Sequence, residues 1–405
     1  MKQNLLAKIR PDQKSPEDEI RSPYYENASA RFGIAQVIIY LFLLLFVVLS
    51  LFNNRDLVTY ENFYYFFKDL NAVNLDLYDA DTVSFPTDEI QSFTLYRKGL
   101  AVAGNNSVSI FTQTGRQLVS SSISYRNPVA VGSGKYLLVY DLGGKNYSLY
   151  NSYSRIHTGT TDDPITASFV SPSGDYAIAT KNDAEGLSTI CFYNDRFTMV
   201  NRYRKTGYVM DLSINDKGNL LAILLSDVSS GAVRTKVFLY VPGESTHKAE
   251  VLLNSGLGVS CRFTSAAHLS VLSEHGADDI SYSGASAHLI DFDGRRILAA
   301  ELSSDGLSLY LSGASLSEKN QLFVFDKTGR RIYRGTSEEN YRTLSRSGKM
   351  LFCLSDGFVE RINTSSGKRE KMSIDTGGKK LLSIDGGEFL LCTPQKAATI
   401  SFRSD

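Results

Sequence analysis

The chain has 405 residues, of which 42% are hydrophobic, so it is long enough to bury a large core. Its 43 Lys and Arg residues balance 43 Asp and Glu residues, which argues against nucleic acid as the main partner, because phosphate binding needs a positive surplus. The four cysteines form no C-x-x-C pair, which argues against a structural zinc site. They lie within or beside apolar alternating runs, which favours isolated buried thiols in strands, with a single disulfide as the alternative. They are Cys191, Cys261, Cys353 and Cys392.

An uncharged apolar segment, "GIAQVIIYLFLLLFVVLSLF", occupies residues 33–52. About 20 helical residues span roughly 30 Å, the hydrocarbon thickness of a bilayer, so the segment predicts a transmembrane helix in contact with lipid. A cleaved signal peptide is the main alternative. The run is longer than the usual span of about 7–15 apolar residues, and the exit "SLFNNRD" lacks small residues at an A-x-A spacing. We therefore interpret the segment as an uncleaved anchor.

Lysine and arginine are unevenly distributed around this segment. Residues 1–32 contain six lysines and arginines, whereas the roughly 20 residues after the apolar segment contain only Arg55 and Lys68. The positive-inside rule then predicts a single-pass protein of the cytoplasmic membrane, with its amino terminus inside and its carboxy-terminal part outside. Residues 1–32 also have prolines and mixed charges, which are typical of a disordered cytoplasmic tail.

Residues 53–78 are predicted to form an amphipathic juxtamembrane stalk helix. Its central part, "TYENFYYFFKDL", starts with Thr59 as a helix cap, has Glu61 in the first turn, and is aromatic on most sides. Such a helix lies at the lipid interface or packs against the following domain, and the sequence does not decide between the two.

A polar turn with glycine, followed by an apolar or alternating run, recurs along the rest of the chain, as in "SPSGDYAIAT" at 171–180. Successive marker glycines are 40, 44, 88, 42 and 39 residues apart. The doubled interval contains a degenerate copy near Ala267, and another turn at Gly99 precedes the series, which makes eight turns. The marker glycines of the series are Gly134, Gly174, Gly218, Gly306, Gly348 and Gly387.

Four strand-like runs in each unit of about 40 residues are typical of a β-propeller blade. The sequence therefore predicts an all-β, eight-bladed β-propeller over residues 79–405, in which each recurring turn joins the first strand to the second. Seven blades are the fallback if the weak copy around 255–300 is an insertion. The last unit has only three strands, so the strand at 81–86 is predicted to supply the fourth and close the ring.

The turn motif resembles the turns of bacterial envelope propellers and WD-repeat-like proteins, and eight blades also occur in quinoprotein dehydrogenases. The chain contains no Trp, which argues against the tryptophan docking and the quinone-cofactor chemistry of quinoproteins. The apolar span is followed by a Thr-x-Glu-Asn element at Thr59, Glu61 and Asn62. Together with the repeat, this element resembles the uncharacterised bacterial domain-of-unknown-function family 5711 over about residues 33–405. The resemblance implies a propeller on a single membrane span, without an assigned activity.

Candidate catalytic and metal-binding residues are few. Imidazole and carboxylate groups gather in residues 268–294, but their spacing matches no compact metal signature, so loop and surface roles are the preferred interpretation. The weak metal candidates are His268, His275, His288, Glu274 and Asp278. No nucleophile elbow, P-loop or dinucleotide motif occurs in a fitting context, so we predict no catalytic residue and no cofactor.

Function is expected in the loops that do not repeat. Residues 181–188 and 228–235 are longer hairpin connections, which are interpreted equally well as a partner surface or as tolerated insertions. The main hypothesis is a membrane-anchored extracytoplasmic scaffold that binds a protein partner or a cell-wall polymer in a bacterial envelope assembly. An alternative is an extracytoplasmic hydrolase or lyase with a site in the central funnel, where the inner strands offer Asp211 and Arg262 but no obvious cluster. A second alternative is a sensor that signals through the cytoplasmic tail.

Overall fold

The computed structural model describes residues 23–53, 82–229, 231–315, 317–375, 377–384 and 387–402. The chain divides into two compact units, Met1–Leu75 and Asp76–Asp405, and each is described by itself. Of the predicted cytoplasmic tail, residues 1–22 lie outside the described residues. The predicted stalk helix over 53–78 also lies outside them, apart from its first residue.

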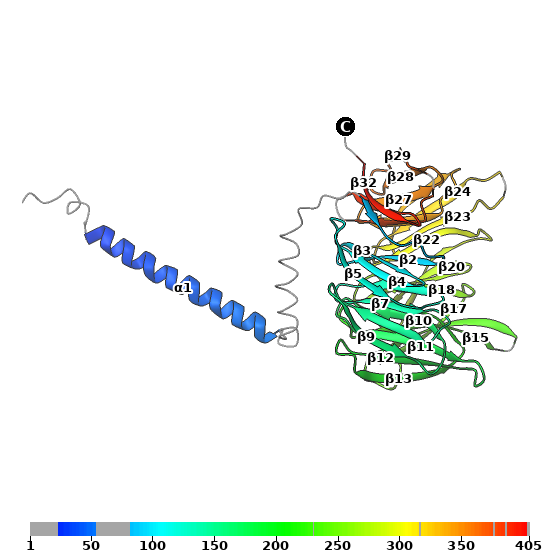
Figure 1. Ribbon diagram of the computed structural model, residues 1–405, viewed down its shortest axis with the longest axis horizontal. Helices are drawn as coiled ribbons and strands as arrows, with labels where there is room; N and C mark the ends of the chain where they lie inside the picture. Colours follow the sequence, from blue (N-terminus) through cyan, green and yellow to red (C-terminus); the bar gives the residue numbers. More distant parts are fainter. Residues whose placement is uncertain are drawn as a thin grey trace, which may run out of the picture. The chain divides into compact units, whose positions relative to one another are not determined.

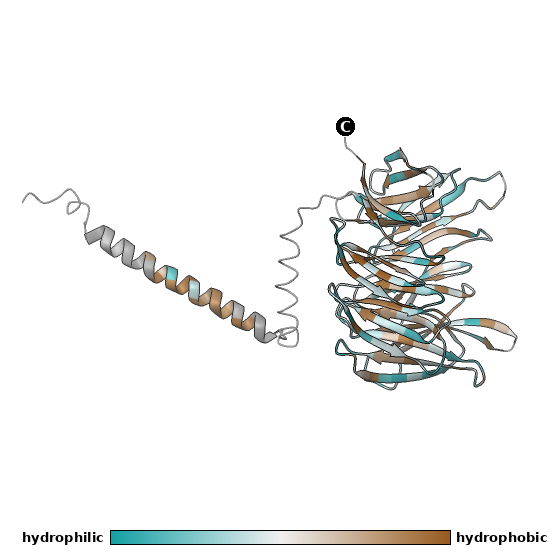
Figure 2. Cartoon of the chain, in the orientation of Figure 1, coloured by the Kyte–Doolittle hydropathy of each residue, from teal (hydrophilic) through white to brown (hydrophobic). Residues whose placement is uncertain are grey.

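The first unit contains helix α1, Pro23–Asn53, which includes the whole apolar segment 33–52. The helix begins at Pro23 rather than at residue 33, and proline fits this first position because its missing N–H has no partner there in any helix. The consecutive side chains of residues 37–46 are all exposed, and Figure 2 shows mostly brown, apolar residues along this part of α1. No helix of the described residues combines the length and apolar character required to cross a membrane, so the predicted span is not confirmed.

The second unit contains eight antiparallel sheets of four strands each, which are the blades of a propeller. The first blade comprises β2 (Gln91–Tyr96), β3 (Gly99–Gly104), β4 (Ser107–Phe111) and β5 (Gln117–Ser122). The second comprises β6 (Pro128–Gly132), β7 (Leu137–Asp141), β8 (Asn146–Tyr150) and β9 (Arg155–Thr160). The third comprises β10 (Ile165–Val170), β11 (Tyr176–Asn182), β12 (Leu187–Tyr193) and β13 (Met199–Thr206). The fourth comprises β14 (Tyr208–Ile214), β15 (Leu221–Ser229), β16 (Ala232–Tyr240) and β17 (Ala249–Leu253).

The remaining blades follow in chain order. The fifth comprises β18 (Gly258–Phe263), β19 (His268–Ser273), β20 (Gly276–Ser281) and β21 (Ser286–Asp291). The sixth comprises β22 (Ile297–Ser303), β23 (Gly306–Leu311), β24 (Asn320–Phe325) and β25 (Arg331–Ser337). The seventh comprises β26 (Thr343–Ser347), β27 (Met350–Ser355), β28 (Phe358–Asn363) and β29 (Arg369–Ser373). The eighth comprises β30 (Lys380–Ser383), β31 (Glu388–Cys392), β32 (Lys396–Ser401) and β1 (Thr82–Ser84).

The first strands of successive blades pack against one another in a closed series from β2 through β6, β10, β14, β18, β22 and β26 to β30, which contacts β2 again. In Figure 1 the red strands of the last blade lie beside the cyan strands of the first. The weak copy around 255–300 forms the fifth blade, so the prediction of eight blades is confirmed and the fallback of seven is excluded.

The closing strand is also confirmed. Strand β1 pairs antiparallel with β32, with Val83 opposite Ala397, and the amide of Phe85 donates to the carbonyl of Gln395 at 3.0 Å. The side chains of Val83 and Phe85 are buried in an apolar cluster that joins the last blade to the first. Pairing the two ends of the domain in one sheet closes the ring.

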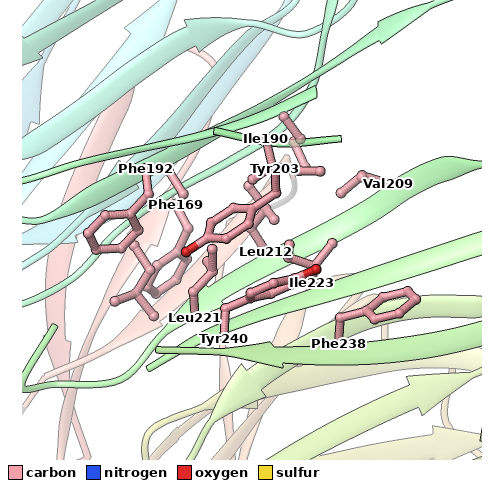
Figure 3. Close-up of a cluster of buried hydrophobic side chains, with 14 of the residues drawn as sticks. Phe169, Ile190, Phe192, Tyr203, Val209, Leu212, Leu221, Ile223, Phe238 and Tyr240 are labelled. Carbon is pink, nitrogen blue, oxygen red and sulfur yellow. The ribbon is translucent and has the colours of Figure 1, made fainter. Parts of the chain in front are cut away.

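Apolar layers between neighbouring blades form the core. Every residue of the second strands β3, β7 and β23 is buried, because these strands have a blade on either side. The layer between the third and fourth blades contains Phe169, Phe192, Tyr203, Leu212 and Tyr240, which Figure 3 shows packed across the two sheets.

The recurring turn lies where the sequence predicts it in all eight blades, between the first and second strands or at the start of the second. In the copy at 171–180, the amide of Ser171 donates to the carbonyl of Asp175 at 2.8 Å, and Gly174 has φ +99°, a conformation that suits glycine. The turns also touch across blades, because a methyl group at Gly218 would collide with the carboxylate of Asp175. The motif therefore serves the geometry of the ring.

Candidate binding face and polar clusters

A hairpin of the fourth blade projects beyond its own sheet. Strands β15 and β16 have nine residues each, and β14 pairs with β15 only as far as Ser226, while β17 pairs with β16 only from Thr235 onward. The outer ends of the two strands, residues 227–229 and 232–234, thus extend past both flanking strands. Figure 1 shows this hairpin projecting from the propeller at β15. It contains most of residues 228–235, one of the two candidate loops of the sequence.

Apolar side chains are exposed at and beside this hairpin. Val228 and Val233 lie opposite each other near its tip and are 74% and 55% exposed. Gly258 donates its amide to Oγ1 of Thr235 at 2.9 Å, so the exposed residues on either side of it, Leu257 and Val259, lie near the base of the hairpin. Exposed Tyr208 pairs with Ser226 at the same end of the sheet. We call this set the hairpin patch: Tyr208, Val228, Val233, Leu257 and Val259.

The second candidate loop, residues 181–188, lies on the same face of the propeller as the projecting hairpin. It contacts the backbone of Gly207, the residue before Tyr208. Nζ of Lys181 and Oγ of Ser188 both donate to the carbonyl of Gly207, at 2.9 and 2.8 Å. Gly207 has φ +117° and lies against Leu225, so the link between the third and fourth blades has little freedom. The two non-repeating loops are therefore neighbours, which their separation in the sequence did not reveal.

The inner strands carry two partly buried carboxyl groups, those of Asp211 and Glu301. Burial raises the pKa of Asp211 in β14 to about 6, although its carboxylate accepts the amides of Leu212 and Cys261 at 2.8 and 2.9 Å. Burial likewise raises the pKa of Glu301 in β22 to about 7, against the effect of a hydrogen bond from the backbone of Arg346. Arg262, the second inner-strand residue predicted from the sequence, lies in β18 with its guanidinium 4.3 Å from the ring centroid of Phe169.

These carboxyl groups belong to a recurring contact between blades. A polar side chain of one first strand accepts a backbone amide of the next first strand, whose edge has no sheet partner. The pairs are Ser92 with Ala130, Thr94 with Gly132, Asp211 with Cys261, Ser213 with Phe263, Glu301 with Arg346, and Ser345 with Ser383. Sequence reasoning missed this role, although a Ser, Thr, Asp or Glu in most inner strands was its visible signal.

The weak metal candidates do not come together in one place. Nδ1 of His288 lies 2.9 Å from Asp278, whereas Nδ1 of His268 lies 2.6 Å from Asp279. Adjacent residues of a strand point to opposite faces, so the two His–Asp pairs lie on opposite faces of the fifth blade. His275 and Glu274 are exposed at a turn, 3.8 Å apart. Within the described residues, no group of three or more His, Cys, Asp or Glu side chains could hold a metal ion.

The closed ring of eight four-stranded blades defines this domain as an eight-bladed β-propeller. The model of a family of unknown function, DUF5711, matches residues 78–402, and the chain belongs to that family. This confirms the family expected from the sequence. The sequence matches no curated protein.

Solved propellers share the fold at low sequence identity. Sqt1 of Saccharomyces cerevisiae superposes with a TM-score of 0.58 at 12% identity, over 79% of this chain and 98% of that chain. BamB from Moraxella catarrhalis superposes with a TM-score of 0.53 at 12% identity, over 81% and 98%. A eukaryotic initiation factor superposes with a TM-score of 0.52 at 13% identity, over 76% and 82%. Identities this low establish the propeller fold alone.

Proposed function

We propose that the propeller is a protein-binding module that docks its partner through the hairpin patch. The observation that carries this proposal is the exposed Val228–Val233 pair at a hairpin tip that extends beyond both flanking strands. Apolar side chains at such a tip add little to the stability of their own domain, and exposed apolar patches are typical of interaction sites. Covering them on binding contributes about 25 cal/mol per Å².

The enzyme alternative requires polar groups that converge on one site. The carboxylate of Asp211 instead accepts two backbone amides, and the two His–Asp pairs lie on opposite faces of a sheet. Among the described residues, these groups are already engaged in contacts that hold the blades. This favours binding over catalysis.

The proposal locates the module outside the cytoplasmic membrane, tethered by residues 33–52, as part of a bacterial envelope assembly. It is supported by the exposed apolar side chains of residues 37–46, which cover every side of α1, and by the six Lys and Arg residues before the segment. An apolar helix surface of this kind is unfavourable in water, which favours its contact with lipid over contact with solvent.

Site-specific photocrosslinking in native membranes tests the binding proposal. A photoreactive amino acid replaces Val233 in the full-length chain, and a control chain has it at Ser286, an exposed position of β21 outside the hairpin patch. We expect a discrete protein adduct from position 233 and none from position 286. Adding Val228→Ser and Leu257→Ser should lower the yield about tenfold or more, because each side chain loses roughly 1–2 kcal/mol of apolar contact.

The outcomes separate the hypotheses. An adduct with a polysaccharide from position 233 would replace the protein partner with a wall polymer. No adduct from position 233, or equal adducts from both positions, would contradict binding through the hairpin patch.

A further inference from the structure

A pocket of about 290 Å³ opens between the second and third blades. On one side lies a face of the third blade formed by β11, β12 and β13. On the other side lie Thr160, at the end of β9, and the linker residues 161–163 that lead into the third blade. This site is separate from the hairpin patch and from the inner strands.

Two cross-strand rows of the third blade line the pocket. Ile178, Cys191 and Arg202 form one row. Thr180, Thr189 and Arg204 form the next row on the same face, because residues two apart in a strand point the same way.

The pocket exists because short side chains leave the space between two blades unfilled. One row farther along, Tyr176 and Tyr193 stack at 4.7 Å between ring centroids and fill that space. At Thr180 and Thr189 no large side chain replaces them. By contrast, the layer between the third and fourth blades is filled by Tyr203 and Tyr240, as Figure 3 shows.

Five charged side chains line this pocket. Arg202 and Arg204 come from β13, and the carboxylates of Asp162, Asp163 and Glu185 come from the linker and the hairpin of the third blade. Within the described part of the chain, no ion pair of 4.0 Å or less joins any of these five groups. Four of the five residues, all except Asp163, are exposed, so charged residues of both signs border the pocket in contact with solvent.

The linker that carries the two aspartates is held in place. Nζ of Lys145 donates to the carbonyl of Asp162 at 2.5 Å, and the amide of Thr161 donates to the carbonyl of Lys145 at 2.8 Å. Oγ1 of Thr161 also donates to the carbonyl of Asp163 at 2.7 Å. This wall is therefore formed before any ligand arrives, which lowers the entropic cost of binding.

We propose that the pocket binds a small zwitterion, namely a free amino acid or a dipeptide with both ends free. The guanidinium groups of Arg202 and Arg204 bind the carboxylate, since a guanidinium matches the planar geometry of that group. The carboxylates of Asp162, Asp163 and Glu185 bind the ammonium group. Ile178 and Tyr193 provide apolar contacts for the side chains of the ligand. The volume of about 290 Å³ lies just below the range of about 300–1,000 Å³ that is typical of ligand pockets, which suits a ligand of this small size.

Calorimetry on the full-length chain in detergent tests this proposal with L-alanyl-L-alanine, its N-acetyl derivative and its C-terminal amide. We expect saturable binding of the free dipeptide and at least about tenfold weaker binding of each blocked form, because each block removes one charge-assisted contact. A second readout is alkylation of Cys191, which lines the pocket and is partly exposed, whereas the other three cysteines are buried. The free dipeptide should slow alkylation of Cys191.

Matched variants assign the contacts. Arg202→Gln combined with Arg204→Gln should weaken binding of the free dipeptide about tenfold or more. In this double variant, the C-terminal amide should bind no more weakly than the free dipeptide. Arg196→Gln is the control, because this exposed arginine lies in the same blade but outside the pocket. The proposal is overturned if neither readout detects binding up to about 10 mM, if the three probes bind equally, or if Arg196→Gln weakens binding as much as the double variant.

Discussion

Each first strand of the propeller has one edge in a sheet and another edge that faces the next blade. Amide groups on that second edge need acceptors, and at four of the blade interfaces a side chain of the preceding first strand provides one. Ser213 accepts the amide of Phe263 at 2.9 Å, and Asp211 accepts the amide of Cys261 at the same distance. Uncharged serine meets this need without cost, whereas an aspartate must bury its charge.

Replacing Asp211 with asparagine tests that cost. The folded protein holds the pKa of Asp211 at about 6, above the value of about 3.9 in unfolded chains, so the folded state binds the proton more tightly. The stability contributed by this group is therefore present at low pH and is lost as pH rises from about 4 to about 6. We expect Asp211→Asn to gain stability relative to wild type over this interval, by at most about 3 kcal/mol. Denaturant unfolding across the interval measures it.

The control for Asp211→Asn is Asp183→Asn, which removes one negative charge from an exposed turn. Its difference from wild type should stay nearly constant over the same pH interval. A difference between Asp211→Asn and wild type that does not change with pH would show that burial of Asp211 carries no proton-linked cost.

Among the structural elements, the short strand β1 pairs across a large sequence separation, because it completes a sheet with residues more than 300 positions away. Its three residues alternate, with Val83 buried between exposed Thr82 and Ser84. Val83 packs in the cluster with Leu390 and Cys392. The burial of this one side chain therefore connects the first and last blades.

We expect Val83→Asp to destabilise the propeller by about 2–5 kcal/mol, because a carboxylate would enter an apolar cluster without a partner. Ser84→Asp is the matched control, since it places the same charge on the exposed side of the same strand and should change stability by no more than about 0.5 kcal/mol. Denaturant unfolding of both variants compares them. Equal effects would mean that β1 is not needed to hold the ring closed.

For the whole molecule, the proposed location of the propeller outside the cytoplasmic membrane can be tested directly. Lys and Arg counts predict residues 1–32 inside and the propeller outside. Labelling with a membrane-impermeant maleimide tests this in a Cys191→Ser background, because the other three cysteines are buried. We expect Ser286→Cys to be labelled in intact cells and Ser15→Cys to be labelled only after permeabilisation. The reverse pattern would overturn the proposed topology.

The number of blades was predictable because the turn that starts each second strand depends on local chemistry. A glycine such as Gly174 or Gly218 adopts a positive φ within a few residues of polar turn formers, and this pattern repeats with the period of a blade. Even the degenerate copy near Ala267 keeps its place between β18 and β19. The closing strand at 81–86 followed from counting the strands of the last copy.

The candidate sites were less predictable because they depend on contacts between distant residues. His268, His288 and Asp278 are close in sequence, yet the alternation of β20 sends the two His–Asp pairs to opposite faces of one sheet. Asp211 and Cys261 are 50 residues apart and meet only when two blades pack.

The sequence by itself determined the repeat, the eight blades, the closing strand and the family, because each depends on local turn chemistry and alternation, which are periodic along the chain. Only the tertiary structure decided what the polar residues do. It set Arg202 and Arg204 beside Asp162 and Asp163 in one pocket, and it placed the two non-repeating hairpins next to each other. The physical reason is that packing of one blade on the next selects these neighbours, and residues a whole blade apart have no local signal that they will meet.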